Sequence, residues 1–498
     1  MNILKYNQKL ELTLFTIFSI VLAFYLEANF TPAEDASILF RYSENLIDTG
    51  VISYNTGGEP TEGATDFLWM VFLSVFYFFG FNTYFASILI NLFSLYIIVN
   101  IIRKHYLLSN IETYGLFFFH FSVTHTYAAL GGFSVLFVEL FLVLVVVNFL
   151  KKNVFNTLLF SFIGCLIRPD FILFIIIPNI INFLENFNFK NIRYFILFIL
   201  LGLIYFYCRY LYFDLFLPLP FYIKNQWSFL NNLEWGRQII ILSPALLIVF
   251  FTDFTKIFKR SVLIILSIAM FATAYYTNQI LYQNVGYRFY FYIPVFLIFI
   301  IYEIQIDIIG SNKVAKNIIL IISFLSIIIN FSQKFSSFNF LSKKEDVYVF
   351  AKELNNINKD LKLSLATTES GLVPYYSGIN TTDLFGINTK ELAKKPADGF
   401  LLLKSNFDII MINSSITGEN CSSLKNALDE SKNLSVKVAN RNDNWSDFNF
   451  KLLYGIDTSK YDSYFFPYPT NIFINKNSKA YKKISNSLKN TKASKCNF

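Results

Sequence analysis

The stretch LTLFTIFSIVLAFYLEANFTPAEDASILFRY, residues 12–42, joins a charge-free apolar run, residues 12–26, to a polar segment with two adjacent acids, Glu34 and Asp35. Comparable apolar runs recur along the chain at 83–102, 133–150, 195–217, 261–281 and 318–331. About 17–25 apolar residues span the hydrocarbon core of a bilayer, and most of these runs reach or approach that length. They also lack the continuous polar face of a helix on a soluble protein. The sequence therefore predicts a polytopic α-helical membrane protein.

Composition and charge agree with this interpretation. The 498 residues are 54% hydrophobic and 15% charged, whereas soluble domains carry about 25% charged residues. The net charge of +8 comes from basic residues that lie mostly between the apolar runs and in the C-terminal third, which indicates membrane orientation and headgroup contact. Because zinc-ligand spacings, a P-loop and a Rossmann glycine pattern are also missing from the sequence, we expect no nucleic-acid partner.

The positions of basic residues predict the topology. Lys5 and Lys9 precede the first run, and the pairs Arg103-Lys104 and Lys151-Lys152 follow later runs. Each predicted inner loop holds at least two basic residues if residues 67–79 form a juxtamembrane helix that does not cross the membrane. This choice gives about eleven spans over residues 1–331, with the N-terminus inside and an outer loop at 27–66.

The tail, residues 332–498, is rich in Asn, Lys and Ser, and its apolar runs are short. Residues 345–355 and 389–395 are typical of helices, and residues 361–367 and 407–413 of strands. We therefore expect a C-terminal extracytoplasmic α/β domain. Cys421 and Cys496 both fall in this tail, where an oxidising compartment would allow them to pair, although their spacing alone leaves pairing open.

The outer segment contains the residues that predict chemistry. Adjacent carboxylates at a membrane surface lose hydration and raise each other's pKa, so Glu34-Asp35 requires a reason beyond solubility. Glycosyl transfer from a lipid phosphate supplies one, because a carboxylate can deprotonate the acceptor hydroxyl while cations stabilise the departing phosphate. The cations predicted at the outer boundary are Arg41, Arg168, Lys224 and Arg288.

Each of these residues also has a plainer interpretation. Acids are ordinary in a solvated outer loop, and arginine side chains at helix ends extend to lipid headgroups. Glu59 and Glu62 flank glycines, where turn residues are expected as well. Two adjacent acids could hold a divalent metal, but one such pair is a weak metal signal. The sequence therefore leaves metal binding open and predicts no other cofactor.

These residues stand in an order that resembles the GT-C superfamily of polyprenyl-phosphate-sugar-dependent glycosyltransferases. The pattern is most similar to the branch that contains the mycobacterial terminal arabinofuranosyltransferases. The resemblance runs from about residue 30 to about residue 395, and its pieces share one order along the chain. The matching segments are 34–38, 41–42, 45–46, 50–57, 62–69, 167–170, 218–224, 286–289, 371–378 and 383–388.

The resemblance implies a GT-C-like fold and an inverting glycosyltransferase, either a hexosyl- or a pentosyltransferase. The enzyme would move a sugar from a polyprenyl-phosphate donor to a glycan, lipid or protein acceptor, on the outer side of a bacterial cytoplasmic membrane. It implies a catalytic acid in the first outer loop, so we expect Asp35 as the base and Glu34 as its helper or an acceptor contact. The expected contacts to donor phosphate or substrate are Arg41, Tyr42, Arg168, Lys224, Arg288, Glu59 and Glu62.

Three departures separate the chain from this pattern. Glu34 stands where relatives have Asp, Ser37 replaces a Tyr, and Gly131-Gly132-Phe133 lacks the acid of a Gly-Leu-Glu element. Two other classes of function also fit apolar spans with outer basic residues. A lipid-linked sugar flippase or transporter would favour internal repeats or many charges inside the spans. An envelope-assembly scaffold would make Glu34-Asp35 dispensable.

Overall fold

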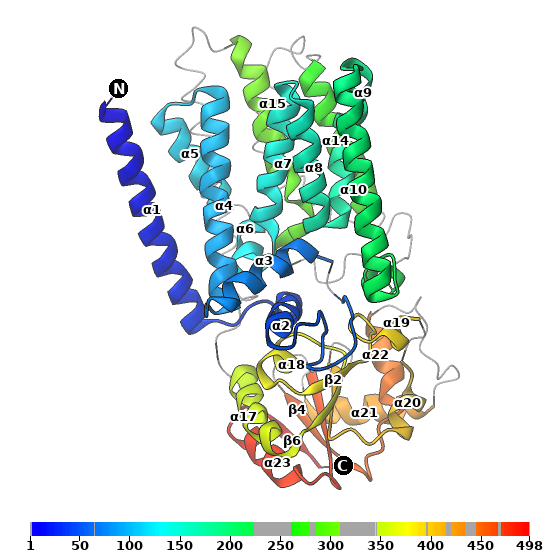
Figure 1. Ribbon diagram of the computed structural model, residues 1–498. Helices are drawn as coiled ribbons and strands as arrows, with labels where there is room; N and C mark the ends of the chain where they lie inside the picture. Colours follow the sequence, from blue (N-terminus) through cyan, green and yellow to red (C-terminus); the bar gives the residue numbers. More distant parts are fainter. Residues whose placement is uncertain are drawn as a thin grey trace.

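The computed structural model describes residues 2–63, 65–122, 124–223, 260–277, 285–308, 344, 346–394, 397–414, 420–433, 445–466 and 470–497. They form a helical bundle and a separate α/β domain, which lies at one end of the bundle (Figure 1). Lys224, the predicted span at 318–331 and the predicted domain boundary at residue 331 lie outside the described residues.

The bundle is built from apolar helices of different lengths. They are α1 (Asn2–Asn29), α4 (Thr83–Tyr106), α5 (Asn110–Ser122), α6 (Thr124–Leu130), α7 (Val135–Leu150), α8 (Val154–Ile167), α9 (Ile172–Glu185), α10 (Phe189–Phe213), α14 (Arg260–Thr277) and α15 (Tyr292–Ile308). Four helices among the described residues are long and apolar enough to cross a membrane: Lys9–Asn29, Thr83–Tyr106, Phe189–Phe213 and Val285–Glu303. This confirms the expectation of a membrane protein, whereas the count of about eleven spans stays a prediction.

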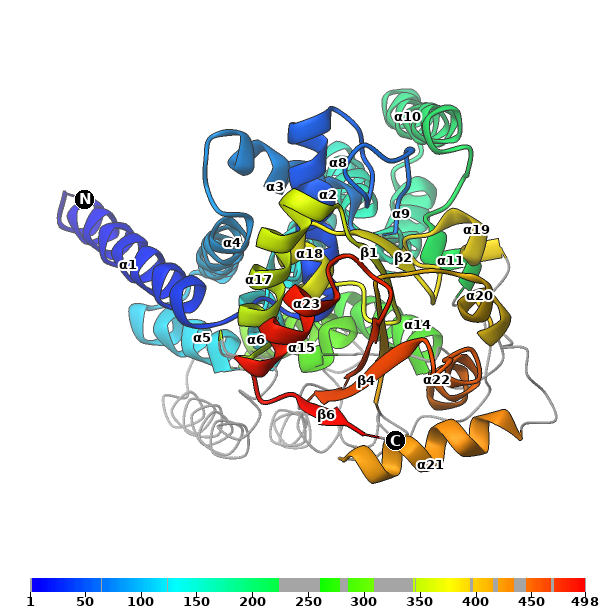
Figure 2. The same cartoon turned by 90° about the horizontal axis from the view of Figure 1, so that it is seen from below.

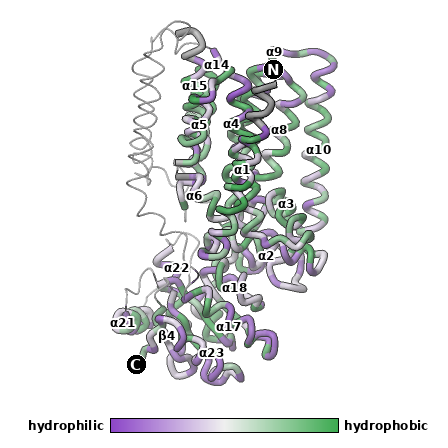
Figure 3. The backbone as a smooth tube through the Cα atoms, turned by 90° about the vertical axis from the view of Figure 1, so that its left-hand side faces the viewer, coloured by the Kyte–Doolittle hydropathy of each residue, from purple (hydrophilic) through white to green (hydrophobic). Residues whose placement is uncertain are grey.

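Apolar residues cover the outside of the bundle. On α10, the side chains of Ile199 and Leu203 are 60% and 62% exposed, which suits contact with lipid and would be costly in water. Figure 3 shows mostly hydrophobic residues along α4 and α8, whereas hydrophilic residues recur on the helices of the α/β domain. The two parts are therefore built for different solvents.

The segment 27–66 is not a simple loop, as the sequence analysis expected, because it contains helix α2 (Glu34–Thr49). One face of α2 is buried, and Gly50 ends the helix in the left-handed region at φ 72°, which glycine adopts without a steric penalty. The next helix, α3 (Phe67–Phe78), is short and lies across the lower ends of the long helices (Figure 1). The juxtamembrane position of this helix stays a prediction.

The α/β domain has one mixed sheet in the order β2-β1-β3-β5-β4-β6. Strands β1 (Ser364–Thr367), β2 (Asn380–Asp383) and β3 (Ile409–Asn413) pair in parallel, whereas β4 (Tyr461–Phe466), β5 (Thr470–Asn475) and β6 (Ser494–Cys496) pair antiparallel. Figure 2 shows helices on both faces. One face packs on α17 (Asp346–Leu361), α18 (Leu372–Ser377) and α23 (Tyr481–Lys489), and the other on α20 (Gly399–Lys404), α21 (Cys421–Lys432) and α22 (Trp445–Leu453).

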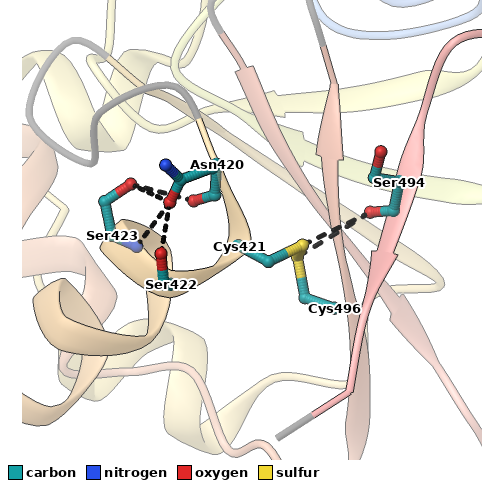
Figure 4. The surroundings of a disulfide bond; sticks show 6 residues. All are labelled: Asn420, Cys421, Ser422, Ser423, Ser494 and Cys496. Atoms are coloured by element: carbon teal, nitrogen blue, oxygen red, sulfur yellow. Dashed lines mark hydrogen bonds between the residues drawn. A yellow bond between two sulfur atoms is a disulfide. The ribbon is translucent and has the colours of Figure 1, made fainter.

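A disulfide joins the first residue of α21 to the last strand. Cys421 and Cys496 are bonded, with their Cα atoms 5.3 Å apart (Figure 4). Sequence spacing left this pairing open, because residues separated by 75 positions meet only after the sheet has formed. Disulfides of this kind persist in oxidising compartments.

The two ends of α4 show how charge is distributed along the bundle. At its first residue, the Thr83 hydroxyl lies 3.2 Å from the Tyr375 hydroxyl of the α/β domain. At its last turn, Arg103 lies 3.5 Å from Glu11 of α1. The basic turn of α4 is therefore at the end of the bundle far from the α/β domain, beside the N-terminal part of the chain.

Candidate active site

The two adjacent acids lie in the first turn of α2, which is packed against the α6–α7 loop. The Ala33 amide donates to the Gly131 carbonyl at 2.9 Å. At Gly132, φ is 102° and an added Cβ would lie 2.6 Å from the Phe40 ring, so only glycine fits this close approach. Acids in a first turn are favoured by the unpaired amides and the dipole of the helix.

Asp35 is paired with Arg288. Arg288 Nη2 donates to Asp35 Oδ2 at 2.7 Å, and the arginine is 6% exposed. Its guanidinium also lies over the Phe133 ring, with Cζ 3.9 Å from the centroid. Within the described residues, Arg288 Nη1 is buried without a hydrogen-bond partner. A buried guanidinium N–H without a partner is costly unless a ligand accepts from it.

The backbone before Arg288 turns sharply. Gly286 and Tyr287 both adopt left-handed conformations within the 3-10 segment η2 (Val285–Tyr290), with φ of 58° and 56°. A non-glycine residue in this region is uncommon and costs free energy. The turn directs the Arg288 side chain towards α2, so this conformation is part of what assembles the site.

Arg168 lies on the same side of the bundle. It binds Asp170 through two bonds, from Nε to Oδ1 at 3.0 Å and from Nη2 to Oδ2 at 2.7 Å. The Cζ atoms of Arg168 and Arg288 lie 5.0 Å and 5.1 Å from the centroid of the same Phe289 ring. Asp35, Arg168 and Arg288, singled out from distant motifs, are thus linked by the Asp35–Arg288 ion pair and the shared Phe289 ring, and we call them the reactive cluster.

Charge pairing sets the ionisation of Arg168 and Asp170 in the turn between α8 and α9. Burial by itself would raise the pKa of Asp170, but attraction to Arg168 outweighs it and lowers the pKa below its usual range. Burial would also lower the pKa of Arg168, and Asp170 together with Asp66 raises it instead. The pair is therefore ionised, with Tyr276 donating to Asp170 Oδ2 at 2.7 Å.

Glu34 has a different surrounding from Asp35, although the two are adjacent. Glu34 Oε1 accepts from the Gly371 amide at 2.6 Å, and Oε2 accepts from the Leu372 amide at 3.0 Å. A Cβ on Gly371 would lie 1.9 Å from the Glu34 carbonyl oxygen, so glycine is required there. Glu34 therefore fastens α2 to the start of α18 in the α/β domain.

Arg41 is directed into the protein, away from the reactive cluster. Its guanidinium donates to the carbonyls of Tyr54 (2.6 Å), Pro374 (2.7 Å) and Ile379 (2.7 Å) and to the Asn55 side chain (3.1 Å). Four of its five donors are thus used. We call these five residues the interdomain clamp. The expected phosphate contact at Arg41 does not fit this placement, because the guanidinium is only 4% exposed.

Three further predicted residues also lie away from the reactive cluster. The Tyr42 hydroxyl accepts from the Gly63 amide at 2.9 Å and donates to Asn388 at 3.2 Å, and burial raises the pKa of Tyr42. Glu62 is paired with Arg209 of α10. Burial raises the pKa of Glu62 to about 7, against the effect of Arg209. Glu59 is exposed at the surface.

A cavity of about 130 Å³ adjoins the first turn of α2. It lies where β1 and β2 end, and its lining includes Glu34, Asp35, Glu369, Asp383 and Trp445. In sheets with parallel strands, ligands bind outside the carboxyl ends of those strands. The tail residues of this lining were not predicted as site residues, because their approach to α2 depends on how the bundle and the α/β domain dock.

Two acids close to the arginines were also missed. Asp170 belongs to the same motif as Arg168, but it was not predicted as a site residue. Asp66 is 7% exposed, accepts from Thr65 at 3.0 Å and also binds the Ser134 hydroxyl. Both acids lie within segments of the family resemblance, 167–170 and 62–69, so the motifs were usable signals for them.

The carboxylates of Glu34 and Asp35 are directed to different partners, the α18 amides and Arg288. Within the part of the chain that the structure describes, no group of three or more His, Cys, Asp or Glu side chains is arranged to hold a metal ion. A divalent metal between the two acids stays a prediction. The cluster offers a carboxylate paired with one arginine, and a second arginine lies against the same phenylalanine ring.

Known proteins resemble this chain mainly in their fold. A family model described as a domain of unknown function, DUF8728, matches residues 347–464, and no curated protein matches the chain. Two solved structures of ArnT from Cupriavidus metallidurans each cover 94% of this chain and 98% of their own. The apo structure is 11% identical with a TM-score of 0.54, and the structure bound to undecaprenyl phosphate is 12% identical with a TM-score of 0.52. The chain therefore has the fold of ArnT, and these likenesses give no support to the arabinofuranosyltransferase branch.

Proposed function

We propose that the protein is an inverting glycosyltransferase that uses a polyprenyl-phosphate sugar as its donor. The observation that carries this proposal is the ion pair between Asp35 and Arg288, in which Arg288 Nη1 has no hydrogen-bond partner among the described residues. The shared fold supports it, because ArnT is a glycosyltransferase of the GT-C kind and one of its structures holds undecaprenyl phosphate.

The cluster separates the two tasks of the reaction. Arg288 Nη1 and the guanidinium of Arg168 receive the donor phosphate, for which arginine forms strong charge-assisted hydrogen bonds. Asp35 Oδ1 receives no hydrogen bond from the described residues, so it is available to a hydroxyl of the acceptor. The two reactants thus meet on opposite sides of one carboxylate.

The transfer is a single displacement. The acceptor oxygen loses its proton to Asp35 and attacks the anomeric carbon, and the bond from that carbon to the phosphate oxygen breaks. The electron pair leaves with the polyprenyl phosphate, whose added negative charge is stabilised by the arginines. A phosphate is a good leaving group, so no strong general acid is required.

The reaction is assigned to the outer side of a bacterial cytoplasmic membrane, with the N-terminus inside and the α/β domain outside. Two observations support this side. The basic last turn of α4 lies beside α1, far from the α/β domain, as the positive-inside rule requires. The Cys421–Cys496 disulfide suits an oxidising compartment. The donor sugar is a hexose or a pentose, and the acceptor is a glycan, lipid or protein.

The alternative of a flippase receives no support from charges inside the described bundle. Glu139 lies between His120 and His125, with Oε1 2.9 Å from His120 Nε2 and Oε2 2.8 Å from His125 Nε2. Arg209 is paired with Glu62. Because these charged groups are paired with each other, they are explained as structural contacts.

The decisive test replaces Asp35 by Asn in a deletion strain. We expect loss of transfer and accumulation of the lipid-linked donor, with normal protein levels, because the isosteric amide cannot take the proton. Asp48→Asn is the matched control, since Asp48 is exposed on the same helix. Unchanged glycans in the Asp35→Asn strain would overturn the proposal and favour a scaffold or a flippase.

A further inference from the structure

The cavity beside Asp35 extends from the reactive cluster into the α/β domain. Asp35 and Ile38 of α2 form one wall, and residues after the ends of β1 and β2, including Ser370 and Phe385, form the other. A buried water needs about 10–15 Å³ of such space, so about 130 Å³ has room for one sugar ring. The cavity therefore places a ligand of that size against the carboxylate proposed as the base.

One side of the cavity is aromatic. Trp445 and Phe385 meet edge to face, with ring centroids 5.1 Å apart at 80°. Trp445 also stacks on Phe448, with centroids 6.2 Å apart at 21°. The indole is half-buried and held by two neighbouring rings. A fixed aromatic face of this kind packs well against the C–H face of a sugar ring.

The charged groups among the described lining residues of the cavity are all carboxylates. Glu34, Asp35, Glu369 and Asp383 line it, and no described lining residue is a lysine or arginine. Glu369 Oε1 accepts from Asn413 Nδ2 at 2.5 Å. Asp383 is fully buried and accepts from Ser370 and Asn388. Carboxylate oxygens accept hydrogen bonds from hydroxyl or ammonium groups and repel phosphate or carboxylate groups at short range.

Charge is therefore divided across Asp35. Arg288 approaches Asp35 through Oδ2, Arg168 contacts the same Phe289 ring as Arg288, and neither arginine is among the described residues that line the cavity. The described carboxylates and the aromatic pair do line it. A binding site that repels one charge class gains specificity by that repulsion.

We propose that this cavity is the acceptor subsite and that it takes a sugar without negative charge, either neutral or amino-bearing, stacked on Trp445. The inference rests on the proposed glycosyltransferase function and adds the class of acceptor to it. Trp445 and Glu369 are specificity-determining residues. Trp445 supplies the apolar contact, and Glu369 supplies part of the negative charge that rejects phosphorylated or acidic sugars.

The test measures binding without catalysis. The full chain in nanodiscs is titrated, with saturation-transfer NMR as readout, against methyl hexosides and pentosides, glucosamine, and glucose 6-phosphate. We expect at least one neutral glycoside or glucosamine to bind, and the phosphate to bind at least tenfold more weakly. Trp445→Leu should lower the affinity for the sugar at least tenfold, whereas Trp445→Phe should keep most of that affinity. Phe400→Leu is the control, because Phe400 is an exposed aromatic residue outside the cavity.

Other outcomes separate the two proposals. Glu369→Gln should reduce the difference in affinity between the neutral sugar and the sugar phosphate, and the neutral sugar should still bind. Equal binding of glucose 6-phosphate, or unchanged binding in Trp445→Leu, would overturn the subsite. If no sugar binds but undecaprenyl phosphate raises the melting temperature, the subsite fails and the donor function stands. If neither ligand binds, both proposals fail.

Discussion

The interdomain clamp and the reactive cluster both centre on an arginine that contacts α2, yet they differ in how its donors are used. In the clamp, Arg41 gives four hydrogen bonds to oxygens of the protein. In the cluster, Arg288 binds Asp35 and keeps Nη1 without a partner among the described residues. The two arginines are almost equally buried, at 4% and 6% exposure.

The difference teaches that burial alone does not mark a functional cation. A buried arginine that gives four of its five donors to protein oxygens holds the fold together. A buried arginine with an unused donor beside a carboxylate is prepared for an anionic ligand. The same distinction separates Glu34, which binds two amides of α18, from Asp35, whose Oδ1 is available.

Removing the clamp should give the largest effect. Arg41→Ala leaves the buried carbonyls of Pro374 and Ile379 without their donor, and each such loss costs about 1–3 kcal/mol. We expect the unfolding free energy in detergent to fall by about 3 kcal/mol or more. Arg193→Ala is the control, because Arg193 is exposed. Equal stability of the two variants would remove the distinction between clamp and cluster.

The reactive cluster should show the opposite behaviour, with a large loss of activity and little loss of stability. Arg288→Ala removes a charge-assisted contact to the donor phosphate worth about 1.5–3 kcal/mol, so transfer should fall about 10- to 150-fold. Melting should stay close to that of the natural protein, because the Asp35 side chain is 26% exposed and water can replace the lost partner. Arg288→Lys should recover part of the activity by restoring the charge. If Arg288→Ala left both kcat and the KM for the donor unchanged, Arg288 would not be a contact of the donor phosphate.

The adjacent acids Glu34 and Asp35 should differ in the same way as the two arginines. Glu34→Gln keeps one carbonyl oxygen for the α18 amides but loses the charge and the second acceptor, at a cost of about 0.5–1.5 kcal/mol. We expect a small drop in melting temperature and transfer within a few fold of the natural protein. Asp35→Asn should show the reverse pattern. A complete loss of transfer in a well-folded Glu34→Gln variant would instead assign Glu34 to the chemistry.

The smallest expected effect is a pH dependence of the folding stability, caused by Glu62 in the segment 27–66. Burial raises its folded-state pKa to about 7, above the unfolded value of about 4.3. Between pH values of about 4.3 and 7, Glu62 is protonated in the folded chain and ionised in the unfolded chain. The protonation of Glu62 therefore stabilises the folded chain fully below the unfolded-state pKa, and this stabilisation is lost as pH rises through the folded-state pKa.

Melting temperatures of the natural protein and Glu62→Gln across this range provide the measurement. Since the amide does not titrate, the natural protein should lose stability relative to the variant as pH rises through about 7. Parallel curves for the two proteins would mean that Glu62 does not titrate in this range.

Local features of the fold were predictable because short-range rules govern them. The helix expected at 67–79 is α3 (Phe67–Phe78), and the strands expected at 361–367 and 407–413 contain β1 and β3. Helix α2 was missed, because its apolar side follows two acids and a proline, and it is stabilised by contacts with the α6–α7 loop and the tail. No window of sequence around α2 contains those partners.

The candidate site was predictable only in part. Asp35, Arg168 and Arg288 were named from motifs and lie together, and their roles stay predictions. Arg41, Tyr42 and Glu62 were named by the same reasoning and lie in structural contacts instead. A motif identifies residues that are needed, but it does not distinguish a ligand contact from a contact within the protein.

The sequence by itself determined the solvent of each part, since long apolar runs belong in lipid and a polar tail with short strands does not. It also determined the reaction class to look for, through adjacent acids and outer arginines. Only the tertiary structure decided which acid faces Arg288, which arginine closes the clamp, and where the acidic cavity opens. Those choices depend on contacts between residues hundreds of positions apart, and such contacts leave no periodic or local trace in the chain.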